Sequence, residues 1–230
     1  MNFDDLKLEQ VVLELKYDLG YRYWDKCGET IIEIGQAFPE WKWKELRPDG
    51  TLLVNQKNED MFLLFSWEAI RLVQNEVQNL NQFKNYCGEL PRIITKCLSI
   101  ENYRRVGNRF WYIYKVEDFE NGQAVLNRSK LLEIPESKTE LFGDRIKARS
   151  FTIIFEKNDF NIRLFVDVFK REDVDIPKEL KYSEEFHPKY MIRYDVDIHT
   201  EKSVKVDSFD CGEFLQKNKN LIASNLTKFF

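Results

Sequence analysis

The chain has 230 residues, of which 14% are aromatic and 32% are charged, and its formal net charge is -4 at pH 7. A chain of this length with so many aromatic residues can bury a packed core, which excludes a disordered protein. The small acidic excess excludes a histone-like polycation and gives no support to a bulk electrostatic grip on nucleic acid.

The N-terminal residues and the cysteines bear on location. MNFDDLKLEQ contains acids and no apolar stretch, so we expect no secretory signal, and no run of about 18 apolar residues predicts a membrane-spanning helix. The cysteines form no CxxC pair, which predicts small core residues rather than a zinc site or a disulfide framework. They are Cys27, Cys87, Cys97 and Cys211. We therefore expect a cytoplasmic protein without a cofactor.

The first part of the chain contains predicted strands and two helices. Alternating apolar residues predict strands over 9–17, 41–46, 51–56, 61–67 and 69–77. Apolar residues at spacings of three and four predict helices over 24–38 and 80–98. Pro39 ends the first helix, and Pro91 lies inside the second, where it predicts a kink or a division into two short helices.

The second part repeats this order. We expect a strand over 103–116, a polar turn over 117–122 and a short helix over 124–134. A hairpin of strands 149–157 and 161–170 follows, then a polar loop over 171–188 and a strand over 190–199. A short edge strand over 203–206 and a helix over 208–230 end the chain, with Ser208 or Asp210 as the helix cap.

The order of elements predicts a single α+β domain of two similar halves, 1–101 and 102–230. We expect an internal duplication in which both halves share one large antiparallel sheet with the helices on one face. The two halves show no residue-level repeat, so the duplication rests on element order alone. The TATA-box-binding protein has a similar unit order, which is a likeness of fold and not of function.

The run YRRVGNRFWYIYKV, residues 103–116, is predicted to be a central strand with two different faces. Because side chains alternate along a strand, Phe110 and Tyr112 lie on an apolar face that we expect to meet the helices. Arg105, Arg109 and Trp111 lie on the opposite face. Arginine beside an aromatic ring can bind phosphate and stack on bases. The favoured interpretation is that both arginines pair with acids on neighbouring strands, since such pairs are common in sheets.

Three acids in the second half suggest a metal-binding site as an alternative. Asp195 and Asp197 lie on one face of a predicted strand, and Asp167 lies on a strand of the preceding hairpin. Such carboxylates could hold Mg²⁺ for nuclease chemistry. If Asp195 and Asp197 pair with Arg105 or Arg109, the aspartates and the arginines satisfy each other and neither set needs a ligand. No GxSxG, Walker loop, HExxH or GxGxxG motif occurs, so we favour a protein without catalytic activity.

The central run also carries a family resemblance. Its strand motif resembles that of a sporadically distributed, uncharacterised family of bacterial and phage proteins, with matches at Arg105, Val106, Gly107, Arg109 and Phe110. Asn108 departs from the usual leucine, and the asparagine that often follows the aromatic residue is missing. VVLELKY (11–17) is similar to the family's opening strand and FPEW (38–41) to the end of its first helix. DVDIH (195–199), followed by a terminal helix, is similar to the family's C-terminal end. The resemblance implies no activity, and the family's patchy distribution implies a role in phage–host conflict.

Two functions follow as expectations. The first is a non-catalytic protein-interaction or regulatory protein, such as a component or inhibitor in phage–host conflict. The alternative is a nucleic-acid-binding protein or metal-dependent nuclease that uses the open sheet face. Another protein is the expected partner, nucleic acid is the second, and self-association through residues 203–206 or through Trp41 and Trp43 is a third option.

Overall fold

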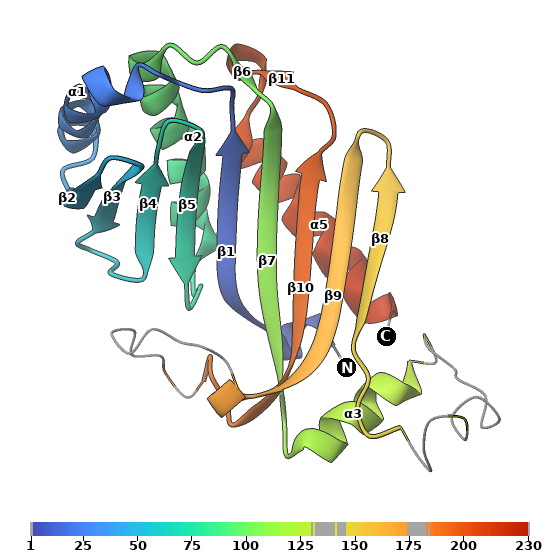
Figure 1. The fold of residues 1–230 in the computed structure, drawn as a ribbon. Coiled ribbons are helices and arrows are strands. Elements are labelled where there is room, and N and C mark those ends of the chain that lie inside the picture. Colours follow the sequence, from blue (N-terminus) through green and yellow to red (C-terminus); the bar gives the residue numbers. More distant parts are fainter. Residues whose placement is uncertain are drawn as a thin grey trace.

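A nine-stranded antiparallel sheet runs through the computed structural model, which describes residues 2–129, 131, 141, 146–173, 183 and 185–229 (Figure 1). Its strand order is β2-β3-β4-β5-β1-β7-β10-β9-β8. The strands are β1 (Lys7–Lys16), β2 (Trp41–Arg47), β3 (Gly50–Asn55), β4 (Met61–Phe65), β5 (Ala69–Asn75), β7 (Arg105–Val116), β8 (Phe151–Lys157), β9 (Phe160–Lys170) and β10 (Tyr190–Thr200). The predicted α+β class and the single large sheet are confirmed.

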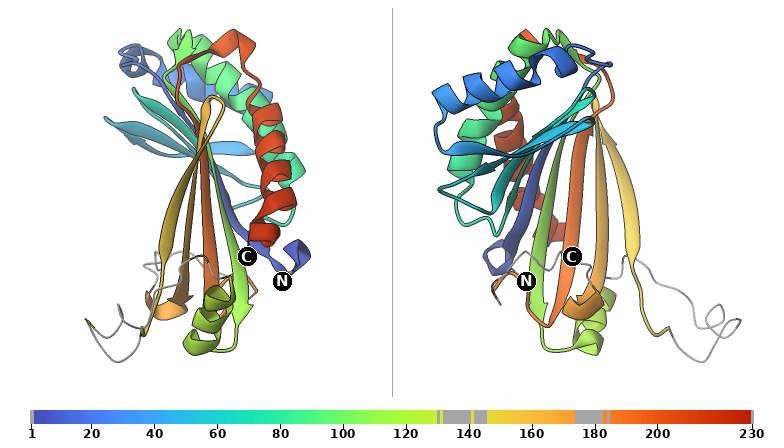
Figure 2. Two further views of the ribbon diagram at one scale, coloured as in Figure 1. Left: turned by 90° about the vertical axis from the view of Figure 1, so that its right-hand side faces the viewer. Right: turned by 60° about the vertical axis from the view of Figure 1, so that its left-hand side comes forward.

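The helices pack against one face of this sheet (Figure 2). They are α1 (Tyr23–Ala37), α2 (Leu80–Leu98), α3 (Phe119–Arg128) and α5 (Cys211–Phe229), with short 3-10 turns η1 (Phe3–Asp5), η2 (Arg171–Asp173) and η3 (Val206–Ser208). The Tyr23 hydroxyl of α1 lies 2.9 Å from Oγ1 of Thr51 on β3, and Nδ2 of Asn218 in α5 donates to Oδ1 of Asn108 on β7 at 2.9 Å. The register places Thr51 and Asn108 on the same face of the sheet, which we call the helix face.

The antiparallel pair β1–β7 joins the two halves of the chain. Outward from β1 the sheet continues with β5, β4, β3 and β2, and outward from β7 it continues with β10, β9 and β8. In each half the chain therefore starts at the central strand, then passes to the edge strand and returns strand by strand towards the centre. Internal duplication, and the likeness to the TATA-box-binding protein, stay predictions.

The helix face contains the core, as the alternation in the central run predicts. Phe110 and Tyr112 of β7 are buried there, together with Leu13 of β1 and Tyr194 of β10. Asn108 is also fully buried, and its hydrogen bond to Asn218 satisfies the side-chain oxygen inside the apolar layer. The opposite face, called the open face below, has no helix packed on it among the described residues (Figure 2).

Three local predictions differ in part from the structure. Residues 119–122 form the first turn of α3 rather than a polar turn, because Oδ1 of Asp118 caps the helix by accepting from the backbone N–H of Asn121. α2 is one helix despite Pro91, so the division into two helices does not occur. The predicted edge strand over 203–206 is β11 (Val204–Lys205), which pairs with β6 (Asn102–Tyr103) in a separate two-stranded sheet.

Other details agree with the sequence or fall outside the described residues. Asp210 caps α5, since its Oδ1 accepts from the backbone N–H of Glu213 at 2.9 Å. Trp41 is buried while Trp43 is 62% exposed, so the two rings do not form a shared surface. The predicted end of the 124–134 helix and most of the 171–188 loop lie outside the described residues. Among the described helices, none is both long and apolar enough to cross a membrane.

Gly122 tests how tightly α3 packs on the sheet. A Cβ at Gly122 would lie 2.7 Å from Cγ1 of Val168, whereas a Cβ at Gly28 in α1 would meet nothing within 4 Å. We expect Gly122→Ala to lower the free energy of unfolding by about 1–3 kcal/mol through overpacking. Gly28→Ala, the matched control, should raise it by roughly 0.5–1 kcal/mol. Denaturant unfolding measures both, and an unchanged stability in Gly122→Ala would contradict this packing.

Candidate functional site

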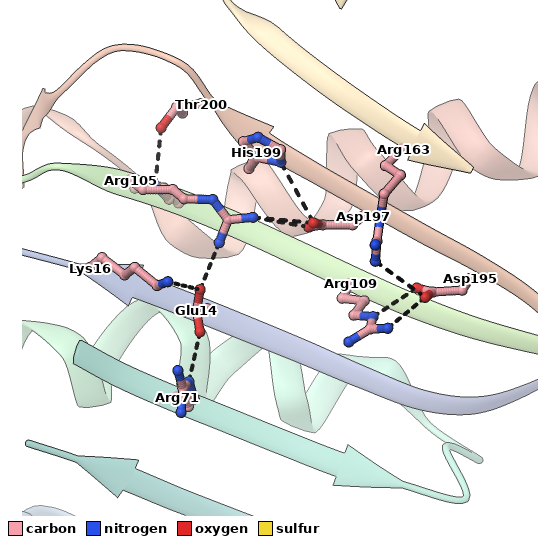
Figure 3. A network of polar contacts seen from close by, with 11 residues as sticks. Glu14, Lys16, Arg71, Arg105, Arg109, Arg163, Asp195, Asp197, His199 and Thr200 are labelled. Atoms are coloured by element: carbon pink, nitrogen blue, oxygen red, sulfur yellow. Dashed lines mark hydrogen bonds and ion pairs between the residues drawn. The ribbon is translucent and has the colours of Figure 1, made fainter. Parts of the chain in front are cut away.

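A network of charged side chains crosses the centre of the open face (Figure 3). It joins neighbouring strands, because the register brings alternate residues of β5, β1, β7, β10 and β9 side by side. Its acids are Glu14, Asp195 and Asp197. Its cations are Lys16, Arg71, Arg105, Arg109 and Arg163.

Glu14 of β1 is the acid that links the two halves of the sheet. Its Oε1 lies 2.6 Å from Nη1 of Arg105 on β7, and its Oε2 lies 2.6 Å from Nε of Arg71 on β5. Nη2 of Arg105 also contacts Oδ2 of Asp197 on β10 at 3.2 Å. The Arg105 side chain passes Gly107, where an added Cβ would lie 3.3 Å from Nη1. Gly107 therefore marks a close approach of a side chain, which is one of the roles expected for a glycine in a strand.

Asp195 of β10 is the second acid that contacts two cations. Its carboxylate accepts two hydrogen bonds from Arg109, from Nε at 2.7 Å and from Nη2 at 2.5 Å. Nη2 of Arg163 on β9 approaches Oδ2 of the same carboxylate at 3.4 Å. A two-point pair of this kind fixes the plane of the guanidinium as well as its position.

The acids of the network are more deeply buried than most of its cations. The side chains of Asp195, Asp197 and Glu14 are 5%, 18% and 19% exposed, whereas those of Arg71, Arg109 and Arg163 are 45%, 40% and 38% exposed. Five cations also outnumber three acids in the network. Solvent above this part of the face therefore meets mainly guanidinium groups, although the whole chain is slightly acidic.

The ion pairs favour the charged forms of Glu14 and Arg109. Burial alone would raise the pKa of Glu14, but its hydrogen bond to Arg71 and the nearby cations lower that pKa below its usual value. The hydrogen bond to Asp195 raises the pKa of Arg109. Burial and the charge of Arg105 lower the pKa of His199, so this imidazole is neutral near pH 7.

Trp111 forms a stacked column with Arg109 and Arg193, so its ring is not free to stack on a ligand. The guanidinium carbon of Arg109 lies 4.8 Å from the centre of the Trp111 ring, and that of Arg193 lies 4.7 Å from it. Arg109 precedes Trp111 by two positions, and Arg193 is paired with Ile113, two positions beyond it. The two cations thus approach the ring from opposite directions along the strand. Arg193 also stacks on Phe169 at 4.7 Å.

A buried ionic cluster lies at one end of this column. Glu9, at the bulge of β1, is within 3.3 Å of Nε of Arg193 and 3.5 Å of Nε2 of His187. All three side chains are buried, and so is Phe186. The segment before β10 therefore covers this end of the open face. Burial raises the pKa of Glu9 against the opposing charge of Arg193, and burial with Arg193 and Arg171 lowers the pKa of His187 to about 4.

The structure decides between the pairing alternatives for the predicted site residues. Arg105 and Arg109 pair with Asp197 and Asp195, as the favoured interpretation required. Asp167 lies on the same face, but burial raises its pKa and it does not join the two other aspartates around a shared centre. No group of three or more potential metal ligands occurs among the described residues. Guanidinium groups occupy the positions where a cation would have to bind.

Sequence reasoning missed Glu14, Arg71, Arg163 and the Glu9–Arg193 pair. The polar positions of β1 alternate with buried Val11, Leu13 and Leu15, so the sequence does place Glu14 on a wet face. It gives no signal that β1 and β7 are neighbours, since this depends on long-range strand order.

Removal of one acid tests whether the network stabilises the fold. Asp195→Asn keeps the size of the side chain but leaves Arg109 and Arg163 without their carboxylate, so we expect a loss of about 1–3 kcal/mol in the free energy of unfolding. Glu213→Gln, which breaks the exposed pair with Lys217 on α5, should change it by no more than roughly 0.5 kcal/mol. Equal changes in the free energy of unfolding in the two variants would contradict a stabilising role of the network, because solvent would then replace the Asp195 ion pairs.

His187 predicts a pH dependence of stability. An unfolded histidine titrates near pH 6.5, and the folded His187 has a pKa of about 4. The folded state then binds fewer protons than the unfolded state between these values, so stability is full above pH 6.5 and falls as the pH drops towards 4. His187→Gln should reduce this slope, by up to about 1.4 kcal/mol per pH unit. Urea unfolding at several pH values measures the free energy of unfolding of wild type and His187→Gln. The same pH dependence in both proteins would contradict the lowered pKa of His187.

Comparison with known proteins adds no relative to this picture. No protein-family model matches the chain, and a search among curated proteins finds no significant match. The resemblance of the central run to a bacterial and phage family stays a prediction.

Proposed function

We propose that this chain is a non-catalytic binding protein that uses the open face of its sheet to hold an acidic protein partner. The observation that carries the proposal is the layering of charge at the centre of that face. Carboxylates lie underneath and more exposed guanidinium groups lie above them, already fixed in place. Cations that are held before binding lose little freedom when a partner's carboxylates arrive.

An apolar area beside the network favours a protein as the partner. Leu52 and Val54 of β3 and Phe62 and Leu64 of β4 are half-buried side chains on the open face. The register places Leu64 directly beside Arg71, so the apolar area continues into the charged network. Arginine and aromatic side chains next to an apolar area are typical of protein interfaces. The family resemblance makes phage and host proteins the first partners to test.

Nucleic acid is the second candidate, and the excess of exposed cations favours it. One observation makes it weaker. Both directions of approach to the Trp111 ring along the strand are taken by Arg109 and Arg193. A base would have to displace one of these cations to stack on Trp111.

Arg71→Ala is the variant that tests the protein partner, since Arg71 is exposed and borders the apolar area. Arg92→Ala is the matched control, because Arg92 is an exposed arginine on α2 that pairs with Glu89. Quantitative mass spectrometry of proteins captured from lysate identifies a partner, which is then purified for titration. We expect Arg71→Ala to raise the Kd by about tenfold, through loss of a charged contact, and Arg92→Ala to leave it unchanged.

Two results would contradict this proposal. One is a purified partner that binds wild type and Arg71→Ala equally, which would place the binding surface elsewhere. The other is tight binding of single- or double-stranded nucleic acid that weakens steeply as salt rises and is lost in Arg71→Ala, which would establish the second candidate.

A further inference from the structure

The two edges of the large sheet differ in how well they are protected. β2 has a bulge between Trp43 and Glu45 and carries alternating charges, which are common devices against unwanted strand pairing. β8 has the sequence FTIIFEK, with no charge, proline or bulge before Glu156. No described element pairs with the outer side of β8 (Figure 1). An apolar edge without protection is suited to pairing with another strand.

β8 exposes an apolar side chain on each of its faces. Ile154 on the open face is 67% exposed, and Phe155 on the helix face is 38% exposed. The ring of Phe155 contacts that of Phe229 in α5 at 5.6 Å between centroids. Between β8–β10 and α5 lies a cavity of about 380 Å³, and Leu221 and Leu226 contribute to its largely apolar lining. The edge thus combines free backbone groups with apolar side chains on either side.

The hairpin geometry shows which backbone groups of β8 point outward. Lys157 pairs with Phe160 across the two-residue turn Asn158-Asp159, and Asn158 has a φ of 57°. In a hairpin with a two-residue turn, the flanking residues form a hydrogen-bonded pair, and such pairs alternate along the strands. Residues 157, 155, 153 and 151 therefore bond inward to β9. The N–H and C=O groups of Thr152, Ile154 and Glu156 point away from the sheet.

We propose that a second copy of this chain pairs with this edge, β8 against β8 in antiparallel orientation, with a two-fold axis at Ile154. This register uses only the outward groups: Ile154 pairs with Ile154 of the second copy, and Thr152 pairs with its Glu156. A symmetric contact of this type closes on itself and forms a dimer rather than a filament.

The neighbouring registers are less favourable. The registers that use the same outward backbone groups are centred on Thr152 or on Glu156. Centring on Glu156 places two glutamates face to face, and centring on Thr152 pairs only Phe151–Ile153 of β8, because the strand begins at Phe151. Like charges directly opposite each other destabilise strand pairs. Centring on Ile154 brings no like charges together.

The Ile154 register also covers the exposed apolar side chains. Ile153 of one copy lies beside Phe155 of the other on the helix face, at the rim of the cavity next to α5. The two Ile154 side chains meet on the open face. Because the two-fold axis is normal to the sheet, both helix layers lie on the same side. The central charged network of each copy stays accessible, so the dimer and the proposed partner binding use different surfaces.

Site-directed crosslinking tests the register. The background carries Cys27→Ser and Cys97→Ser, since these two cysteines are less buried than Cys87 and Cys211. Ile154→Cys should give a crosslinked dimer with a short bismaleimide, because the paired Cα atoms are about 5.5 Å apart. Glu156→Cys is the control. Its two copies would be four residues out of register, about 14 Å apart along the strand, and should not crosslink.

Sedimentation equilibrium tests the dimer itself in the full chain. Wild type should sediment as a dimer. Ile154→Lys should raise the dimer dissociation constant at least about tenfold, because it brings two lysines together at the axis. Ile154→Pro should do the same, because it removes only an outward N–H. Circular dichroism checks that both variants keep the fold. A monomeric wild type, a dimer unaffected by both substitutions, or equal crosslinking at residues 154 and 156 would overturn the proposal.

Discussion

The Arg105 guanidinium holds the two halves of the molecule together electrostatically. It lies between Glu14 on β1, from the first half, and Asp197 on β10, from the second. The strands on either side of β7 are thereby linked through side chains as well as backbone hydrogen bonds. Glu14 in turn holds Arg71 on β5, so the ionic contacts extend across four adjacent strands. The apolar helix face supplies most of the free energy of folding, while this network determines what the open face presents to solvent.

The same ion pairs hold the strands together and determine which charged groups the open face exposes. Buried carboxylates orient the guanidinium groups, and the guanidinium groups shield the carboxylates from a second role as metal ligands. Trp111 is stacked against Arg109 and Arg193, so its ring is not free to stack on a base. The half-buried side chains of Leu52, Val54, Phe62 and Leu64 on β3 and β4 then form the apolar part of the surface. These features underlie the proposal of an acidic and apolar protein partner.

Much of the fold could be predicted from the sequence, because local periodicity determines strands such as 9–17 and helices such as 80–98. The errors come from local hydrogen bonds that periodicity does not detect, as at Asp118, whose side chain starts α3 earlier than the apolar pattern indicates. For the site, the sequence placed Arg105 and Arg109 on one face and offered Asp195 and Asp197 as their partners. It could not reveal Glu14, Arg71 or Arg163 as members of the network, since their positions depend on the order of strands that are far apart in the chain.

A double-mutant cycle between Arg105 and Glu14 tests most directly the claim that buried acids hold the cations of the open face. The free energies of unfolding of wild type, Arg105→Ala, Glu14→Ala and the double variant give the coupling between the two side chains. The structure predicts a favourable coupling of about 1 kcal/mol or more, because both side chains are largely withdrawn from solvent and share one short contact. A coupling indistinguishable from zero, as expected for a fully exposed surface pair, would contradict this account.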